Sequence, residues 1–259
     1  MGGVIMENRA IKVIIEKDKP CVCGSGIDFE NCCMKKNHRY EGLLREDGTY
    51  GIYDETEFVT AAKSLLSFID LRVEKENLKL TFDSSSKKLN KLYDKLGNTL
   101  KPIHKASSCR EGCSHCCHLL VLTSKLEYEI IKNFIEVNFS NEDKEKLKTK
   151  INNIQDILKV LEHKDERFTS DSYNIYNKED IPCAFLGDNN RCTIYSVRPY
   201  ICRKYLVLND PKVCEDPSKK TTQYYAKYLT TVKNAIGKLN KLTYGDLTYN
   251  HLLSWFLEK

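Results

Sequence analysis

Residues 109–117 read CREGCSHCC, and residues 183–203 read CAFLGDNNRCTIYSVRPYICR. The first stretch packs four thiols into nine residues, and the second, with Cys214 further on, supplies four more. Cys113 and Cys116 are separated by two residues, a spacing that lets both sulfur atoms reach one metal ion from a turn that Gly112 allows. A helical hairpin between the two stretches would return the chain, so the pattern predicts one metal centre assembled from two distant segments.

A thioredoxin-like redox pair is the alternative interpretation of Cys113-x-x-Cys116. That pair needs a strand before it and a helix that opens at the first cysteine, and neither flank fits. His115 and His118 lie inside the cysteine-rich stretch and are further candidate ligands. The predicted ligands of the second centre are Cys109, Cys113, Cys116, Cys117, Cys183, Cys192, Cys202 and Cys214.

Residues 21–33, CVCGSGIDFENCC, form a separate group of four cysteines. Thirteen residues are too few to close a loop around a hydrophobic core, whereas four thiolates at about 2.3 Å from one Zn²⁺ would close it. The segment 24–26, Gly-Ser-Gly, supplies a tight turn, and Phe29 is placed to cover the metal. The predicted zinc ligands are Cys21, Cys23, Cys32 and Cys33, with His38 as a weaker candidate.

The cellular compartment can be inferred from whether the twelve cysteines of this 259-residue chain form disulfides or bind metal. Disulfides are the alternative to metal, but disulfide-rich secreted domains are short, and charges interrupt every apolar stretch of the first 17 residues. No run approaches the roughly 20 apolar residues of a membrane-spanning helix. We therefore expect a cytoplasmic protein with reduced thiols and no membrane partner.

The remaining chain predicts a mainly α fold: a small N-terminal zinc module plus a helical domain organised around a cysteine-rich metal centre. We expect an arm at 1–17, the zinc module at 18–36, a linker at 37–53 and the helical domain at 54–259. Apolar spacing predicts a strand at 10–15, and Ser124 with Glu127 predicts a capping box. The predicted helices span 54–71, 84–96, 124–137, 141–164, 221–239 and 246–257, with the helix 141–164 in an internal hairpin. Gly97 and Asn98 are expected to end the helix 84–96.

The net charge of +5 is concentrated in two lysine-rich segments. Residues 84–105 and 218–241 each contain six lysines, and the second segment also holds Tyr224, Tyr225 and Tyr228. Interleaved lysines and aromatics suit a nucleic-acid surface, while the alternative is a helix whose tyrosines pack inward beneath solvated lysines. A weak contact with ribosome, RNA or a protein chaperone is therefore a partner hypothesis, beside the metal ions.

At its N-terminal cysteines the chain resembles the SEC-C motif, whose pattern C-x-C-G-S-G-x-x-F-x-x-C-[CH] matches residues 21–33 at every signature position. The resemblance implies zinc binding by Cys21, Cys23, Cys32 and Cys33. In proteins that carry this motif it also contacts a chaperone and ribosomes.

Residues 105–207 resemble the YkgJ-type cysteine-cluster family, also called the CxxCxxCC zinc- or iron-chelating domain. The resemblance rests on the cysteine-rich segment 109–117, here called the knot, and on the residues around the later cysteines. These residues are Phe185, Leu186, Ile194, Tyr195, Arg198, Pro199 and Arg203. The chain departs from the family pattern in having three residues between Cys109 and Cys113. Relatives include flagellin lysine-methylating proteins.

These observations predict a metal-binding protein with a SEC-C-like zinc site and a second zinc or iron centre, which could be an iron–sulfur cluster. No nucleotide-binding glycine loop, H-E-x-x-H or nucleophile elbow is present, so no catalytic residue is assigned. One alternative is an iron–sulfur-dependent protein-modifying enzyme related to the flagellin methylating proteins. The other is a binding module associated with ribosomes or secretion.

Overall fold

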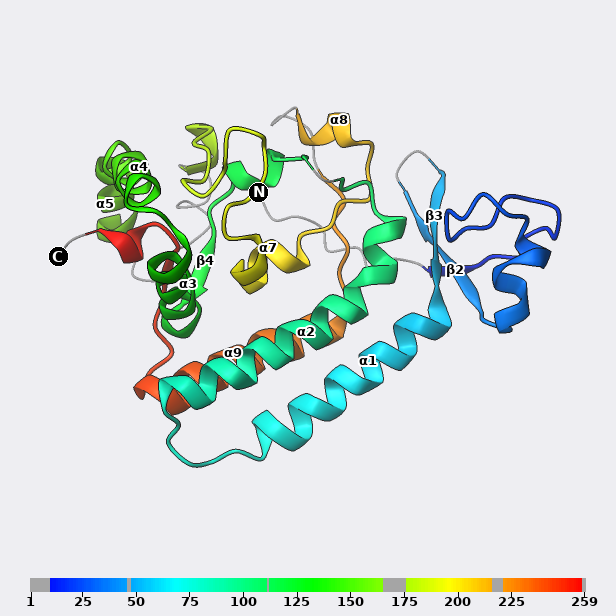
Figure 1. The fold of residues 1–259 in the computed structure, drawn as a ribbon, viewed down its shortest axis with the longest axis horizontal. Coiled ribbons are helices and arrows are strands. Elements are labelled where there is room, and N and C mark those ends of the chain that lie inside the picture. Colours follow the sequence, from blue (N-terminus) through cyan, green and yellow to red (C-terminus); the bar gives the residue numbers. More distant parts are fainter. Residues whose placement is uncertain (1–9, 46–47, 111, 165–175, 216–220, 258–259) are drawn as a thin grey trace.

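The computed structural model describes residues 10–45, 48–110, 112–164, 176–215 and 221–257. The predicted class is confirmed, because helices dominate and the four N-terminal cysteines form a small module of their own. Figure 1 shows three long helices, α1, α2 and α9, along one side of the molecule, with the cysteine-rich loops above them and the N-terminal module at one end. No helix in this part of the chain is both long and apolar enough to cross a membrane.

Helix α1 (Glu55–Ile69) confirms the helix predicted at 54–71. It begins at Asp54, whose side chain accepts a 2.9 Å hydrogen bond from the backbone N–H of Glu57. A π-helical segment, Asp70–Glu74, continues it. Leu65, Ile69 and Val73 are fully buried, so α1 contributes one apolar stripe to the core of the three long helices.

Helix α2 (Phe82–Ala106) is ten residues longer at its C-terminus than predicted, because it continues through Gly97 and contains Pro102. A Cβ atom at Gly97 would meet nothing within 4 Å, so close packing does not require a glycine at this position, and Gly97 does not end the helix. Burial of an uninterrupted apolar face outweighs the roughly 1 kcal/mol cost of a mid-helix glycine. That face consists of Leu89, Leu92, Leu96, Leu100 and Ile103.

Helix α9 (Lys227–Tyr244) packs against α1 and α2 and completes this core with Val232, Ile236 and Leu239. Tyr224 and Tyr228 are buried as well. The inward-packing interpretation of this lysine-rich segment is therefore the correct one for these two tyrosines, and they are not available to stack with nucleobases.

The helix predicted at 246–257 is wrong. Strand β5 (Tyr249–His251) pairs in antiparallel fashion with β4 (Leu122–Ser124), and a short 3-10 helix, Ser254–Phe256, follows. The pairing of Leu122 with His251 joins segments 129 residues apart, which no local pattern reveals.

The second hydrophobic core lies under helices α3 (Lys125–Asn138), α4 (Asn141–Asn152) and α5 (Gln155–Lys164). The capping box of Ser124 and Glu127 at the start of α3 is confirmed. The single helix predicted at 141–164 is instead two helices, because α4 ends at Asn152. Leu147, Ile151 and Leu158 are buried within the same chain, as an internal hairpin requires.

The zinc module is attached through a three-stranded antiparallel sheet in the order β1 (Ala10–Lys12), β2 (Tyr40–Leu44), β3 (Tyr50–Asp54). Strands β2 and β3 occupy the segment 37–53 that was expected to be a linker. The sheet contacts the end of α2: Arg45 Nη2 donates a 3.2 Å hydrogen bond to the carbonyl oxygen of Ala106. Strands β2 and β3 therefore pack on the helical domain and do not merely connect to it.

Candidate metal centres

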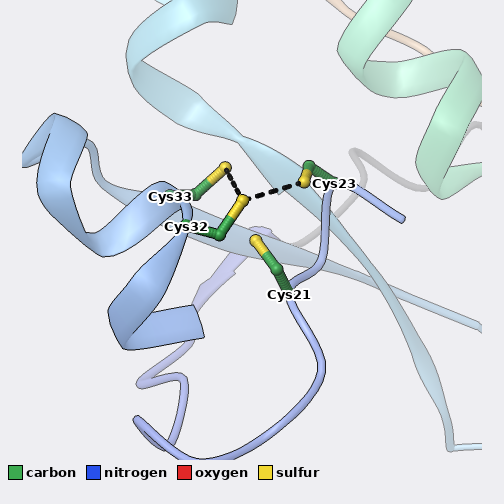
Figure 2. A group of neighbouring side chains, drawn as sticks. All are labelled: Cys21, Cys23, Cys32 and Cys33. Carbon is green, nitrogen blue, oxygen red and sulfur yellow. Dashed lines mark hydrogen bonds between the residues drawn. The ribbon is translucent and has the colours of Figure 1, made fainter. Parts of the chain in front are cut away.

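The four cysteines of the N-terminal module converge on one point (Figure 2). Their sulfur atoms all lie within 4.8 Å of one another. Cys23 Sγ and Cys32 Sγ are 3.6 Å apart, and Cys32 Sγ and Cys33 Sγ are 3.9 Å apart. Two short 3-10 helices, Phe29–Asn31 and Cys33–Lys36, present the later pair.

This spacing fits a tetrahedral metal ion. Four sulfur atoms at about 2.3 Å from a central Zn²⁺ would lie about 3.8 Å from one another by tetrahedral geometry. The two sulfur–sulfur distances above bracket that value, so Zn²⁺ would fit between the sulfurs with little rearrangement. The ion would supply cross-links that hold the loop together.

The local sequence explains how four thiols meet within thirteen residues. Gly24 and Gly26 have φ values of 81° and 75°, a left-handed conformation that favours glycine. The turn closes when Gly24 N–H donates a 3.0 Å bond to the Cys21 carbonyl and Cys21 N–H donates a 2.8 Å bond to the Ile27 carbonyl. Phe29, as predicted, is buried beside the thiols.

The thiols of the module differ in their readiness to ionise. Hydrogen bonds from Ser25 lower the pKa of exposed Cys23 to about 6. Burial raises the pKa of Cys33 to about 12, and the neighbouring thiols add to that shift. Cys23 is therefore a thiolate at neutral pH, whereas Cys33 would lose its proton only when a cation arrives to compensate its charge.

Tyr40 on β2 completes the module from outside the cysteine loop. Its side chain packs with Cys21, Cys33 and Phe29, and its ring meets that of Phe29 edge-on at 5.5 Å. The Tyr40 hydroxyl is buried, and it has no hydrogen-bond partner among the residues that the structure describes. Burial raises the pKa of Tyr40, and a negative charge on the neighbouring Cys33 would raise it further. The Tyr40 hydroxyl therefore stays protonated beside Cys33.

We expect Tyr40→Phe to weaken zinc binding by about tenfold, because the buried hydroxyl lies beside Cys33 and would donate to its thiolate once a metal ion is bound. Competition with a chromophoric zinc chelator would measure the change. Tyr53→Phe is the matched control, since the Tyr53 hydroxyl donates to Glu41 at 2.6 Å on the same sheet. Equal zinc affinities for the two variants would contradict this role.

His38 is not part of the four-sulfur cluster. Its Nδ1 lies 2.7 Å from Asp54 Oδ2, and Glu57 is the third member of this separate group. Asp54 already accepts the capping bond from Glu57 N–H. The pair therefore anchors the segment after the module to the start of α1.

The two segments of the second centre are joined by their backbones. Cys183 N–H donates a 2.7 Å hydrogen bond to the carbonyl of Cys117, within the 3-10 helix His115–His118. At the other end of the knot, Val207 N–H donates to Cys109 Sγ at 3.4 Å. The predicted return of the chain is therefore observed, so residues far apart in sequence meet here.

Three of the later cysteines interact electrostatically with Cys116. Burial raises the pKa of Cys183 to about 12, and it also raises the pKa of Cys202 on helix α7 (Tyr200–Lys204). The charges of Cys183, Cys116 and Cys192 contribute to the shift at Cys202, so these four thiols are electrostatic neighbours. We call Cys116, Cys183, Cys192 and Cys202 the inner group.

A second set of electrostatic neighbours consists of Cys109, Cys113 and Cys214, which we call the outer group. Cys214 ends the short helix α8 (Pro211–Cys214). Burial raises its pKa to about 11, and the charges of Cys113, Cys109 and Cys116 add to the shift. Cys109 packs against the core of the long helices, whereas Cys183, Cys192 and Cys202 pack against the core of α3–α5. Cysteines of the second centre thus contact both hydrophobic cores.

The sulfur atoms of the second centre are more widely spread than those of the module. Across the described residues, no three of them lie within 4.8 Å of one another. The structure brings the segments together without closing a tetrahedral site. These eight ligand assignments therefore stay predictions.

The arginines and histidines near the knot have specific partners. Arg198 lies 4.0 Å from the ring centroid of Tyr195, which is 57% exposed and not in the core. Arg203 donates to the carbonyls of Arg198 and Ser196, both at 2.7 Å, and not to sulfur.

The charge of Arg198 lowers the pKa of Cys116, Cys192 and Cys202 against the raising effect of burial and neighbouring thiols. His115 Nε2 lies 3.8 Å from a Glu215 carboxylate oxygen, and His118 Nδ1 lies 2.8 Å from Asp180 Oδ1.

Glu127 supports the second centre, a role beyond the capping box that was predicted. Its Oε1 accepts hydrogen bonds from Tyr93 Oη at 2.5 Å and from Tyr200 N–H at 2.9 Å. Tyr200 is the first residue of α7, which carries Cys202. A buried carboxylate at 4% exposure thereby fixes the start of the helix that presents one thiol of the inner group.

Comparisons with known proteins agree with both clusters. Residues 108–227 match a family model, CxxCxxCC, that describes a zinc- or iron-chelating domain, and residues 19–35 match the model of the SEC-C motif. No curated protein and no solved structure matches the chain. The first match contains all eight cysteines of the second centre, and the other contains the four convergent thiols. Residues 19–35 are therefore similar to the SEC-C motif and residues 108–227 to zinc- or iron-chelating CxxCxxCC domains, and together with the cysteine clusters these matches support metal binding by the chain.

Proposed function

We propose that the chain holds one structural zinc ion in the SEC-C module and a separate zinc or iron centre at the junction of its two hydrophobic cores. The observation that supports the structural zinc ion is the convergence of four thiols at near-tetrahedral spacing. These thiols belong to Cys21, Cys23, Cys32 and Cys33. An all-thiolate tetrahedral set has no open coordination position, so this ion is structural.

The second centre is supported by the family match over residues 108–227 and by the hydrogen bond that joins Cys183 to Cys117. Seven of the eight later cysteines also fall into the inner and outer groups of electrostatic neighbours. The inner group would hold the first metal or cluster, with Arg198 offsetting part of its negative charge. The outer group would hold a second ion or cap the first. Such a centre, drawing on both cores, would fix α7 and α8 to the end of α2.

Metal analysis of the anaerobically purified full chain tests both halves. We expect Cys21→Ser/Cys23→Ser to lose one zinc per chain and to keep the metal of the second centre. Cys113→Ser/Cys116→Ser should lose the second metal and keep that one zinc. Ser114→Ala, between the same two cysteines, is the matched control and should keep both.

Analysis of iron, zinc and acid-labile sulfide in the same samples identifies the metal of the second centre. Iron with acid-labile sulfide and a brown colour would favour an iron–sulfur cluster, and with it the alternative of a protein-modifying enzyme. Zinc alone would favour a structural centre. A wild-type chain that holds no metal after anaerobic purification would refute the proposal.

A further inference from the structure

A basic groove lies along α9, far from the cysteines in sequence and apart from the proposed metal function. Its cavity has a volume of about 930 Å³ between α9, the segment 76–79 before α2 and the segment 245–249 after α9. Four lysines line it: Lys79, Lys233, Lys238 and Lys241.

The charge of the groove is positive and largely uncompensated. Glu76 is the one acidic residue that lines it, and this carboxylate lies 3.4 Å from Lys88 Nζ. Lys238 is paired with Glu74. Lys79, Lys233 and Lys241 are exposed and have no ion-pair partner within the part of the chain that the structure describes.

The floor of the groove is apolar and aromatic. Gly237 has no side chain at the point where Tyr249 crosses the helix: a Cβ atom there would lie 3.2 Å from Tyr249 Oη. Leu247, which is 57% exposed, lies on the same floor. The half-buried Tyr249 and the backbone of α9 at Gly237 therefore line the groove together with the four lysines.

We propose that this groove binds single-stranded nucleic acid, with phosphates at the lysine rim and a base on the floor beside Tyr249. Single-strand sites combine a positive groove that follows the backbone with aromatic side chains that stack with bases. Lys233 and Lys241 are eight residues apart on one helix, about 12 Å along its axis, so they would contact different phosphates. A peptide of acidic residues alone would use the lysines but has no aromatic group for the floor, whereas every nucleotide carries both a phosphate and a base.

The binding of a fluorescein-labelled 12-nucleotide single-stranded RNA to the full chain, followed by anisotropy at 50 and 200 mM salt, tests this. We expect Lys233→Glu/Lys241→Glu to weaken binding at least tenfold at 50 mM salt. Two lost phosphate contacts should also reduce the slope of log K against log salt by about 1.4. Lys63→Glu/Lys159→Glu is the matched control on exposed faces of α1 and α5, with the same change in net charge, and should cost less than about threefold.

A second variant separates stacking from charge. Tyr249→Leu keeps the apolar bulk but removes the aromatic face, so binding should weaken by at least about fivefold with an unchanged salt slope. Thermal melts of every variant confirm that the fold is retained. Equal losses in the two charge-reversal pairs, no RNA binding by the wild type at 50 mM salt, or displacement of RNA by polyglutamate at matched charge would each overturn the proposal, the last in favour of an acidic protein.

Discussion

Replacement of Glu127 with alanine is expected to lower the free energy of unfolding by about 4 kcal/mol or more. The carboxylate accepts four hydrogen bonds, from Tyr93 Oη, Tyr200 N–H, and both N–H and Oγ of Ser124. All of these donors lie in the buried region between α2, α3 and α7. Alanine would leave them without an acceptor, at a cost of about 1–3 kcal/mol for each buried group that finds no other partner.

Urea denaturation of the Glu127→Ala chain measures this effect, with Tyr93→Phe as the control. Phenylalanine at position 93 removes a single donor and keeps the ring, against which Arg203 lies at 4.2 Å. We expect the control to lose about 1–2 kcal/mol. Since Tyr200 begins the helix that carries Cys202, Glu127→Ala should also lower the metal content of the second centre. If Glu127→Ala lowered the free energy of unfolding no more than Tyr93→Phe does, the stabilising role of the four hydrogen bonds would be contradicted.

Replacement of Gly51 with alanine should lower the free energy of unfolding by about 2–3 kcal/mol. A Cβ atom at Gly51 would lie 1.9 Å from the carbonyl oxygen of Ala106, and backbone at that position cannot rotate away. Strand β3 would have to separate from the end of α2, which would also break the bond from Arg45 to the same carbonyl. Ala106 is three residues before Cys109, so the sheet that adjoins the N-terminal module packs on the helix that leads to the second cysteine group.

Gly97→Ala is the matched control for this prediction. Gly97 lies inside α2, and a Cβ atom there meets nothing within 4 Å. Alanine should therefore stabilise the chain by about 0.8–1 kcal/mol through its higher helix propensity. Thermal or urea unfolding would compare the two variants, and a Gly51→Ala chain as stable as wild type would contradict the close packing of β3 on α2.

The sequence predicted local features well where a short pattern has one physical solution. The zinc loop followed from four thiols within thirteen residues, and the capping box at Ser124 followed from hydrogen-bonding side chains three residues apart. Both are closed by contacts within a few residues. Element boundaries were less predictable: Gly97 was expected to end a helix that tertiary packing carries through to Ala106.

Strands that pair over long distances could not be predicted from the sequence. Residues 40–44 and 50–54 are too short and too polar to stand out, and they become strands because they pair with each other and pack on Ala106. Strand β5 forms because β4 offers an edge to it, more than a hundred residues away. In both places the tertiary environment, and not local preference, selects the extended chain.

The sequence by itself determined that four thiols share one short N-terminal loop, and it predicted a larger centre built from two distant cysteine segments, because cysteine spacing limits which sulfurs can reach one ion. Only the tertiary structure decided what surrounds those thiols. It placed Tyr40 beside Cys33, anchored α7 on Glu127, and assembled a basic groove from three segments around α9. These groups act through burial and through contacts between distant residues, which exist only after the chain has folded.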